Sequence, residues 1–194
     1  MITETRDHKQ INSQCLNSND FESLMDYFNG LSNETKRRFG PHLFDQQSVM
    51  DFYENGDQNR GFWAIDTKTN DIISYAIIKQ GFLVHDQSRL QKYGLKLDNQ
   101  TDCTFAPSVA DMWQGIGVGI AILHFIISEI QEIGINRIIL WGGVQSNNVH
   151  AKNHYLKAGF KVLGYFEYHG QNEDMILELK VQATTKKIPM CSSE

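Results

Sequence analysis

The chain has 194 residues, of which 41% are hydrophobic and 21% are charged, and its formal net charge is -5. This length and composition are typical of one globular domain that can bury a sizeable core. A protein that neutralises a phosphate backbone needs an excess of basic residues. The acidic balance therefore argues against nucleic acid as a partner, and equally against an anionic membrane surface.

The cysteines and the N-terminal segment bear on where the protein works. Cys15, Cys103 and Cys191 are odd in number and far apart, which argues against a disulfide framework and against a zinc site, and no other metal site is predicted. Residues 1–10 are polar where a secretory signal would be apolar, and the longest apolar run, residues 116–127, is too short to span a bilayer. We therefore expect a cytoplasmic protein without a membrane anchor.

Hydrophobic spacing and turn signals predict an alternation of helices and strands. In chain order we expect helices at 18–31, 32–40 and 46–55, a hairpin at 60–84, a strand at 101–109, a helix ending at 134, a strand at 136–143, a helix at 147–159 and a hairpin at 160–181. No repeat or linker divides the chain, so we predict a single domain over residues 1–181 and a loose tail over residues 182–194.

The segment DMWQGIGVGIAILHFIISEIQEIG, residues 111–134, has three glycines at the start of its helix. Such a start offers an anion free backbone N–H groups and the positive end of the helix dipole. A Walker A loop does not fit, because Gly119 is followed by Ile120 rather than by lysine. A dinucleotide fingerprint fits poorly, since its third glycine position holds Ile120 or Ile122. Close packing of the helix is an alternative reason for the glycines.

Two motifs together identify a family. Gln114, Gly117 and Gly119 fit the pattern Gln/Arg-x-x-Gly-x-Gly/Ala, and residues 148–160 fit Asn-x-x-Ala-x-x-x-Tyr-x-Lys-x-Gly-Phe one strand later. Over roughly residues 18–181 the chain resembles the GNAT family of acetyl-CoA-dependent N-acetyltransferases. The resemblance implies an α/β fold with a mixed, mostly antiparallel, twisted sheet of about seven strands flanked by helices. The fourth and fifth strands, near 104–109 and 137–141, would part at one end. Residues 7–16 are a weak candidate for the first strand.

The resemblance also implies which residues bind acetyl-CoA and which act in catalysis. Backbone groups at Val109 and Asp111 would bind the pantetheine arm together with Asn148, which could equally cap its helix. Tyr155 would be the general acid, because a phenol with a pKa of about 10 stays protonated at neutral pH; packing alone is its alternative role. The pyrophosphate would be held by Gln114 and the amides of Gly115, Ile116, Gly117, Val118, Gly119 and Ile120.

The general base is not identified by the sequence. Relatives often have a glutamate on the fourth strand, where this chain has Thr104, which cannot take up a proton. Asp102, Asp111, His85 and a water chain remain as candidates, whereas His124 is expected in the core of its helix. We therefore name no base.

The predicted function is transfer of an acetyl group from acetyl-CoA to a primary amine, most simply that of a small molecule. A protein lysine or N-terminus is the alternative acceptor. An acyl-CoA-binding module without turnover is the alternative function, and the absence of a carboxylate at Thr104 supports it. Residues 85–100 would either cover the acceptor site or form a surface excursion, and a homodimer is compatible with the sequence.

Overall fold

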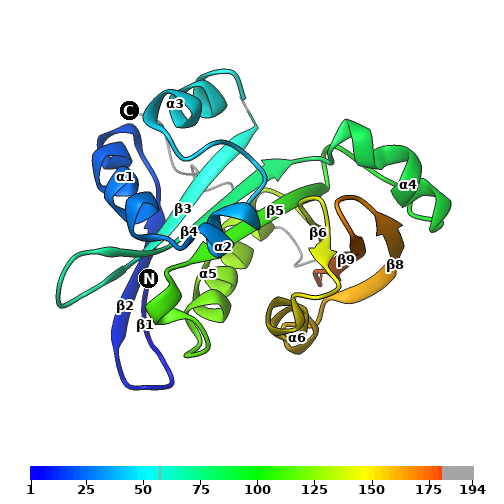
Figure 1. Ribbon diagram of the computed structural model, residues 1–194. Coiled ribbons are helices and arrows are strands. Elements are labelled where there is room, and N and C mark those ends of the chain that lie inside the picture. Colours follow the sequence, from blue (N-terminus) through cyan, green and yellow to red (C-terminus); the bar gives the residue numbers. More distant parts are fainter. Residues whose placement is uncertain (57, 181–194) are drawn as a thin grey trace. The chain divides into compact units, whose positions relative to one another are not determined.

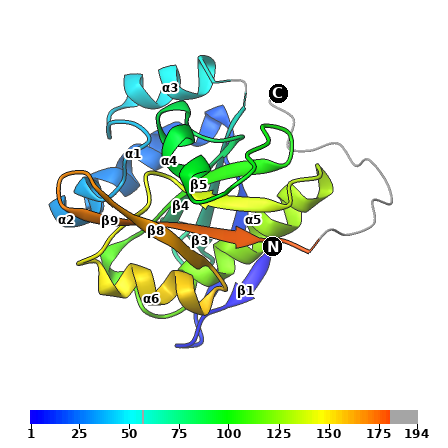
Figure 2. The ribbon, with the colours of Figure 1, turned by 90° about the vertical axis from the view of Figure 1, so that its right-hand side faces the viewer.

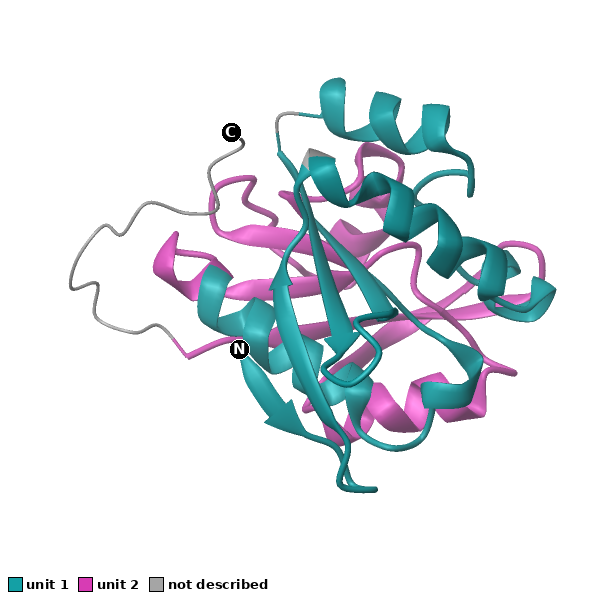
Figure 3. Ribbon diagram, turned by 90° about the vertical axis from the view of Figure 1, so that its left-hand side faces the viewer, with its two compact units in different colours: residues 1–78, 106–129, 188–194 teal, residues 79–105, 130–187 magenta. Residues whose placement is uncertain are grey.

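The structure is a computed structural model that describes residues 1–56 and 58–180. The described residues fall into two compact units (Figure 3). Unit 1 comprises residues 1–78 and 106–129, and unit 2 comprises residues 79–105 and 130–180. The predicted tail at 182–194 lies outside the described residues, and the single domain stays a prediction.

The helices of unit 1 that precede its long strands confirm the sequence prediction. They are the 3-10 turn η1 (Ser18–Asp20), α1 (Phe21–Gly30), α2 (Asn33–Arg37) and α3 (Gln46–Glu54) (Figure 1). Ser32 and Asp45 cap α2 and α3, since each side chain accepts the backbone N–H three residues further on. The apolar side of α1 is buried through Leu24 and Phe28.

The strands of unit 1 form an antiparallel series that extends from the N-terminus. They are β1 (Ile2–Glu4), β2 (Gln10–Cys15), β3 (Asn59–Asp66), most of β4 (Ile72–Gln80) and the end of β5 (Asp102–Val109). Glu4 pairs with Gln10 in the hairpin of β1 and β2, and Ile11 pairs with Asp66. The weak candidate at 7–16 is thus confirmed as β2, whereas the three-residue β1 was not predicted.

The glycine-rich segment follows β5 within unit 1. A 3-10 turn, η3 (Asp111–Trp113), leads to α5 (Val118–Glu132), whose first twelve residues belong to unit 1 and whose last three belong to unit 2. The buried residues of α5 recur at helical spacing, because Val118, Ile122 and Ile126 are inaccessible to solvent. His124 lies on the other side of α5 and is exposed, so the expectation of a core histidine is wrong.

Unit 2 contains the remaining strands together with α4 and α6. Its further elements are η2 (Val84–Asp86), α4 (Gln87–Lys92), β6 (Arg137–Leu140), β7 (Val144–Gln145), α6 (Val149–Lys157), β8 (Lys161–Glu167) and β9 (Gln171–Glu178). β5 and β6 are parallel, and β9 pairs antiparallel with β6, β7 and β8. α6 lies beside β8 and β9 (Figure 2). This is the predicted order of strand, helix and hairpin.

The described strands are hydrogen-bonded in the order β1-β2-β3-β4-β5-β6-β9-β7, with β8 beside β9. The mixed, mostly antiparallel sheet is as predicted, but it has nine strands rather than about seven, because the short β1 and β7 were not foreseen. The parallel register of β5 with β6 ends at Phe105 and Leu140, although β5 continues to Val109. The predicted parting of these strands stays a prediction.

Residues 85–100 are an ordered part of unit 2. The Arg89 guanidinium lies 2.7 Å from Asp174 on β9 and 2.8 Å from Asp86. Leu90 is buried with Ile139 and Ile176 in the hydrophobic core of this unit. Residues 85–100 therefore pack against the strands of unit 2. Whether they cover an acceptor site stays a prediction.

The cysteines differ from expectation at one position. Cys103 is a buried free thiol whose pKa is raised by desolvation. Cys15 is disulfide-bonded, so the expectation of cysteines without disulfides is wrong there. No helix among the described residues is long and apolar enough to cross a bilayer.

Candidate functional site

The glycine-rich turn between β5 and α5 has the geometry of an anion cradle. Gly115 and Gly117 have φ of 81° and 103°, which side chains with a Cβ rarely adopt. The N–H groups of Ile120 and Ala121 both donate to the Gly117 carbonyl, at 3.1 and 3.0 Å. The amides before them, in the first turn of α5, have no acceptor within the helix. They are therefore available to an anion at the positive end of the helix dipole.

Gln114 connects this turn to the end of β5. Its Nε2 donates to the Val109 carbonyl at 3.1 Å and reaches Thr35 Oγ1 at 3.4 Å. A carbonyl oxygen has two lone pairs, so Val109 can still accept from a pantetheine amide. The structure thus places Val109, Gln114 and the glycine turn together in unit 1.

The Asp111 carboxylate accepts hydrogen bonds from α2 and from Ser32, the residue before that helix. It accepts from Ser32 N and Oγ at 2.9 and 2.7 Å and from Thr35 Oγ1 at 2.9 Å. Desolvation raises the pKa of Asp111, but the hydrogen bonds from Ser32 and Thr35 outweigh it and the net shift is downward. The side chain is therefore an ionised clamp on the start of α2, which leaves the backbone of Asp111 for the predicted role.

Tyr155 lies on α6 in unit 2, and Asn148 immediately precedes this helix. The Tyr155 ring packs against Phe160, with centroids 5.3 Å apart, and desolvation raises the pKa of its phenol well above the usual value. The phenol is thus protonated at neutral pH and can donate a proton. Asn148 caps α6, because its Oδ1 accepts from Ala151 N at 3.2 Å. Its side-chain N–H₂ group is left for other acceptors.

A buried ion pair that the sequence did not reveal fixes α6 to β9. Lys152 Nζ lies 2.6 Å from Glu173 Oε1, and the Glu173 side chain is 2% exposed. The second oxygen, Oε2, is buried and has no hydrogen-bond partner among the described residues. Lys152 is three residues before Tyr155, so the pair holds the helix turn that carries the predicted acid.

Comparisons with known proteins identify the fold. No family model and no curated protein sequence matches the chain. The GNAT domain of PAT from S. lividans is 21% identical, with a TM-score of 0.72 over 92% of this chain and 96% of that chain. The chain has the GNAT fold. YncA from Salmonella typhimurium, solved with its cofactor acetyl-CoA, is 15% identical, with a TM-score of 0.64 over 92% and 99% of the two chains. Ribosomal-protein-S5-alanine acetyltransferase from Vibrio fischeri is 16% identical, with a TM-score of 0.62 over 96% and 100%.

Within this GNAT fold, Thr104 lies where relatives often have a glutamate, and Asp102 and His85 are candidate bases. Thr104 is buried and donates to the Gly81 carbonyl at 2.9 Å. Asp102 is fully buried and pairs with Arg137 at 2.8 Å. His85 is exposed and lies 3.5 Å from Asp86. Asp102 and Thr104 are therefore structural, and no carboxylate replaces Thr104 on this strand.

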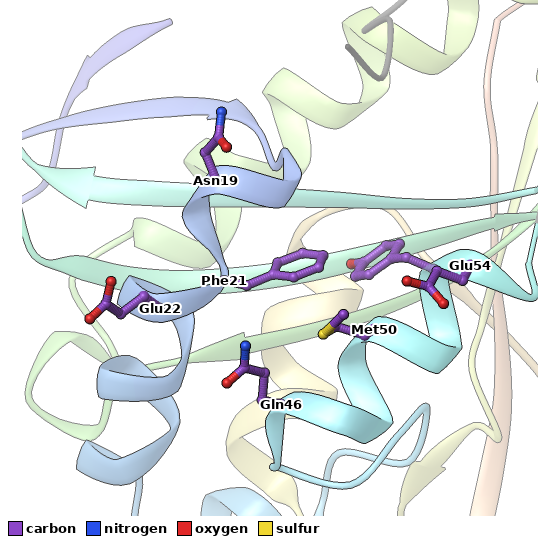
Figure 4. Close-up of a pocket in the computed structure, with 7 residues that line it drawn as sticks. Asn19, Phe21, Glu22, Gln46, Met50 and Glu54 are labelled. Atoms are coloured by element: carbon purple, nitrogen blue, oxygen red, sulfur yellow. The ribbon is translucent and has the colours of Figure 1, made fainter.

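A second polar cluster of unit 1 joins α3, strand β4 and the segment between α2 and α3. Tyr53 and Tyr75 hydroxyls are 2.7 Å apart, and His42 Nε2 is 3.0 Å from Tyr75. His42 Nδ1 is 2.7 Å from the Leu43 carbonyl, so it carries the proton and Nε2 accepts from Tyr75. Tyr53 also lines an open cavity of about 450 Å³ between α1 and α3, which Figure 4 shows with Phe21 and Met50. Sequence spacing gave no sign of this chain of hydrogen bonds.

Proposed function

We propose that the protein is an acetyl-CoA-dependent N-acetyltransferase that acetylates a primary amine of a small molecule. The observation that carries this proposal is the glycine turn before α5 in a GNAT fold. Gly115 and Gly117 hold conformations that only glycine adopts easily, and the first amides of α5 have no helical acceptor. An anionic donor such as the pyrophosphate of acetyl-CoA fits this set of donors.

The binding roles follow from the groups that the described residues leave free. The amides from Gly115 to Gly119 would hold the pyrophosphate. The Ile120 N–H and the Gln114 side chain were also predicted to bind it, but they already donate to the Gly117 carbonyl and to Val109 and Thr35, so they would have to exchange these partners for the phosphate. Val109, the Asp111 backbone and the Asn148 amide would bind the pantetheine arm as an added strand does. The donor supplies an activated acetyl group as a thioester.

The chemistry requires a neutral amine and a proton for the departing sulfur. The amine nitrogen attacks the thioester carbonyl, the C–N bond forms, the C–S bond breaks and the nitrogen releases one proton to solvent. Tyr155 donates its phenolic proton to the sulfur and regains one from solvent, and burial keeps this phenol protonated beforehand. No base is assigned, because an amine that is partly neutral in solution needs none.

Two observations support alternatives. The absence of a carboxylate at Thr104 favours an acyl-CoA-binding module without turnover. The likeness to the ribosomal-protein-S5-alanine acetyltransferase supports a protein N-terminus as acceptor, and a protein lysine is the related case. We expect a cytoplasmic enzyme, with a homodimer compatible with the fold.

Release of free CoA thiol from acetyl-CoA tests the proposal directly. The full chain is supplied with acetyl-CoA and a panel of small primary amines, a lysine peptide and a peptide with a free alanine N-terminus. Release that depends on one amine class establishes an enzyme and its acceptor. Tight binding of acetyl-CoA without release for any acceptor would favour the binding module.

A further inference from the structure

The turn between β1 and β2 is a feature that the two family motifs do not include. Thr5 N donates to the Lys9 carbonyl at 2.8 Å, and Lys9 N donates to Thr5 Oγ1 at 3.1 Å. Thr5 is buried, although it lies in a turn of otherwise polar residues. The turn of residues 5–9 is therefore closed on itself by backbone and side chain together.

This turn is docked on the glycine segment. Arg6 N donates to the Ile116 carbonyl at 2.9 Å. Arg6 Cγ lies 3.7 Å from the position that a Cβ on Gly117 would occupy. Lys9 Nζ lies 4.3 Å from the centre of the Trp113 ring. A backbone hydrogen bond and a cation–π contact thus join residues 5–9 to residues 113–117, all within unit 1.

The backbone contact fixes the direction of an amide in the cradle. In a planar trans peptide, the carbonyl and the following N–H point in opposite directions. Because the Ile116 carbonyl faces Arg6, the Gly117 N–H is held pointing away from the Arg6 backbone. The hairpin therefore orients a donor that a flexible glycine segment would otherwise leave free to rotate.

No carboxylate among the described residues forms an ion pair with Arg6. Arg6 is exposed and forms no ion pair within the described residues, whereas Arg38, Arg89 and Arg137 each pair with carboxylates. The nearby Asp7 carboxylate is held by Lys9 and Thr5. A guanidinium that begins two bonds beyond Cγ is thus available beside Gly117.

We propose that Arg6 is a phosphate-binding residue for the CoA donor, brought to the glycine turn by the hairpin of β1 and β2. This inference rests on the proposed function. A guanidinium binds phosphate oxygens through two parallel N–H donors. It also carries a full positive charge, which the amides of the helix do not. The phosphate is either the pyrophosphate or the 3′-phosphate, which share this chemistry.

Binding calorimetry of the full chain tests the proposal with CoA and with 3′-dephospho-CoA. We expect Arg6→Gln to weaken CoA binding by about 5- to 30-fold at low salt, the range of one partly exposed charge-assisted hydrogen bond. The loss should shrink as salt is added. Arg6→Lys should recover only part of it. Lys92→Gln, which removes the same charge from the exposed side of α4, should leave affinity unchanged.

The two ligands distinguish the phosphates. A loss for CoA alone assigns Arg6 to the 3′-phosphate, and an equal loss for both ligands assigns it to the pyrophosphate. Any non-proline residue keeps the Arg6 N–H donor, so the variants should fold, and thermal unfolding checks this. CoA affinity within two-fold of wild type in folded Arg6→Gln would overturn the inference. Absence of CoA binding by the wild type would instead overturn the proposed function.

Discussion

Lys152 on α6 and Glu173 on β9 form an ion pair of 2.6 Å that joins two elements of unit 2. The carboxylate is almost fully buried, so Lys152 supplies its only positive partner among the described residues. Loss of one partner from such a pair leaves an uncompensated charge in a low-dielectric environment. The pair therefore supports the helix that carries Tyr155.

We predict that Lys152→Met lowers the free energy of unfolding, because it leaves the buried Glu173 carboxylate without its positive partner. Denaturant unfolding measures this change. Lys157→Met, at the exposed end of the same helix, should cost less than about 0.5 kcal/mol. The double variant Lys152→Met, Glu173→Met should recover part of the loss. Equal effects of the two lysine variants would contradict a special role for the pair.

Stability should fall in mild acid because of His42. Desolvation lowers the pKa of His42 below its usual 6.5, so the folded state takes up a proton less readily than the unfolded state. The contribution of neutral His42 to the free energy of unfolding is complete above about pH 6.5. It is lost as the pH falls towards the pKa of His42 in the folded state, by at most about 1.4 kcal/mol per pH unit. Urea unfolding at several pH values from 7.5 to 5 measures the slope.

A matched pair of variants isolates this histidine. His42→Gln should flatten the pH dependence, whereas the exposed His124→Gln should leave it unchanged. The prediction fails if the slope below pH 6.5 is the same in wild type and His42→Gln.

Gly117→Glu should abolish acetyl-CoA binding, because it places a carboxylate where the phosphates are expected. Gly117→Gln has nearly the same shape without the charge and should bind more weakly than wild type but more tightly than Gly117→Glu. Gly94→Ala is the control for backbone strain, since Gly94 has φ of 83° with open space around it. Strain should cost about 1–2 kcal/mol of stability at either site. Retained binding by folded Gly117→Glu would exclude the cradle.

The ligand preference of the cradle gives an independent prediction. CoA should displace acetyl-CoA, whereas NADH and ATP should not do so at similar concentrations, because the segment lacks a Walker lysine and the third dinucleotide glycine. Competition binding with the four compounds measures this. Strong displacement by ATP or NADH would return these ligands as candidates.

Periodic features could be predicted from sequence, and long-range polar contacts could not. The spacing of Leu24 and Phe28 and the glycines before α5 are local signals, and each led to the correct element. The contact of Arg6 with Ile116 joins residues far apart in the chain, and it has no periodic signal. His124 was misplaced because α5 is apolar on most sides, although burial follows one stripe through Val118 and Ile122. The glycine turn before α5 was thus predictable, and its hydrogen bond to the hairpin of β1 and β2 was not.

Tyr155→Phe separates an enzyme from a binding module. The phenylalanine ring keeps the packing against Phe160, so acetyl-CoA affinity should stay within a few-fold. If the phenol protonates the departing thiolate, the transfer rate should fall by about 10²- to 10⁴-fold, the usual range for a lost general acid. A thiol with a pKa of about 8.5 is already a fair leaving group, so the lower end is expected. Steady-state transfer and cofactor binding are measured on the same protein, with exposed Tyr165→Phe as control. An unchanged rate would remove Tyr155 from catalysis, and a rate loss matched by weaker binding would make it a cofactor contact.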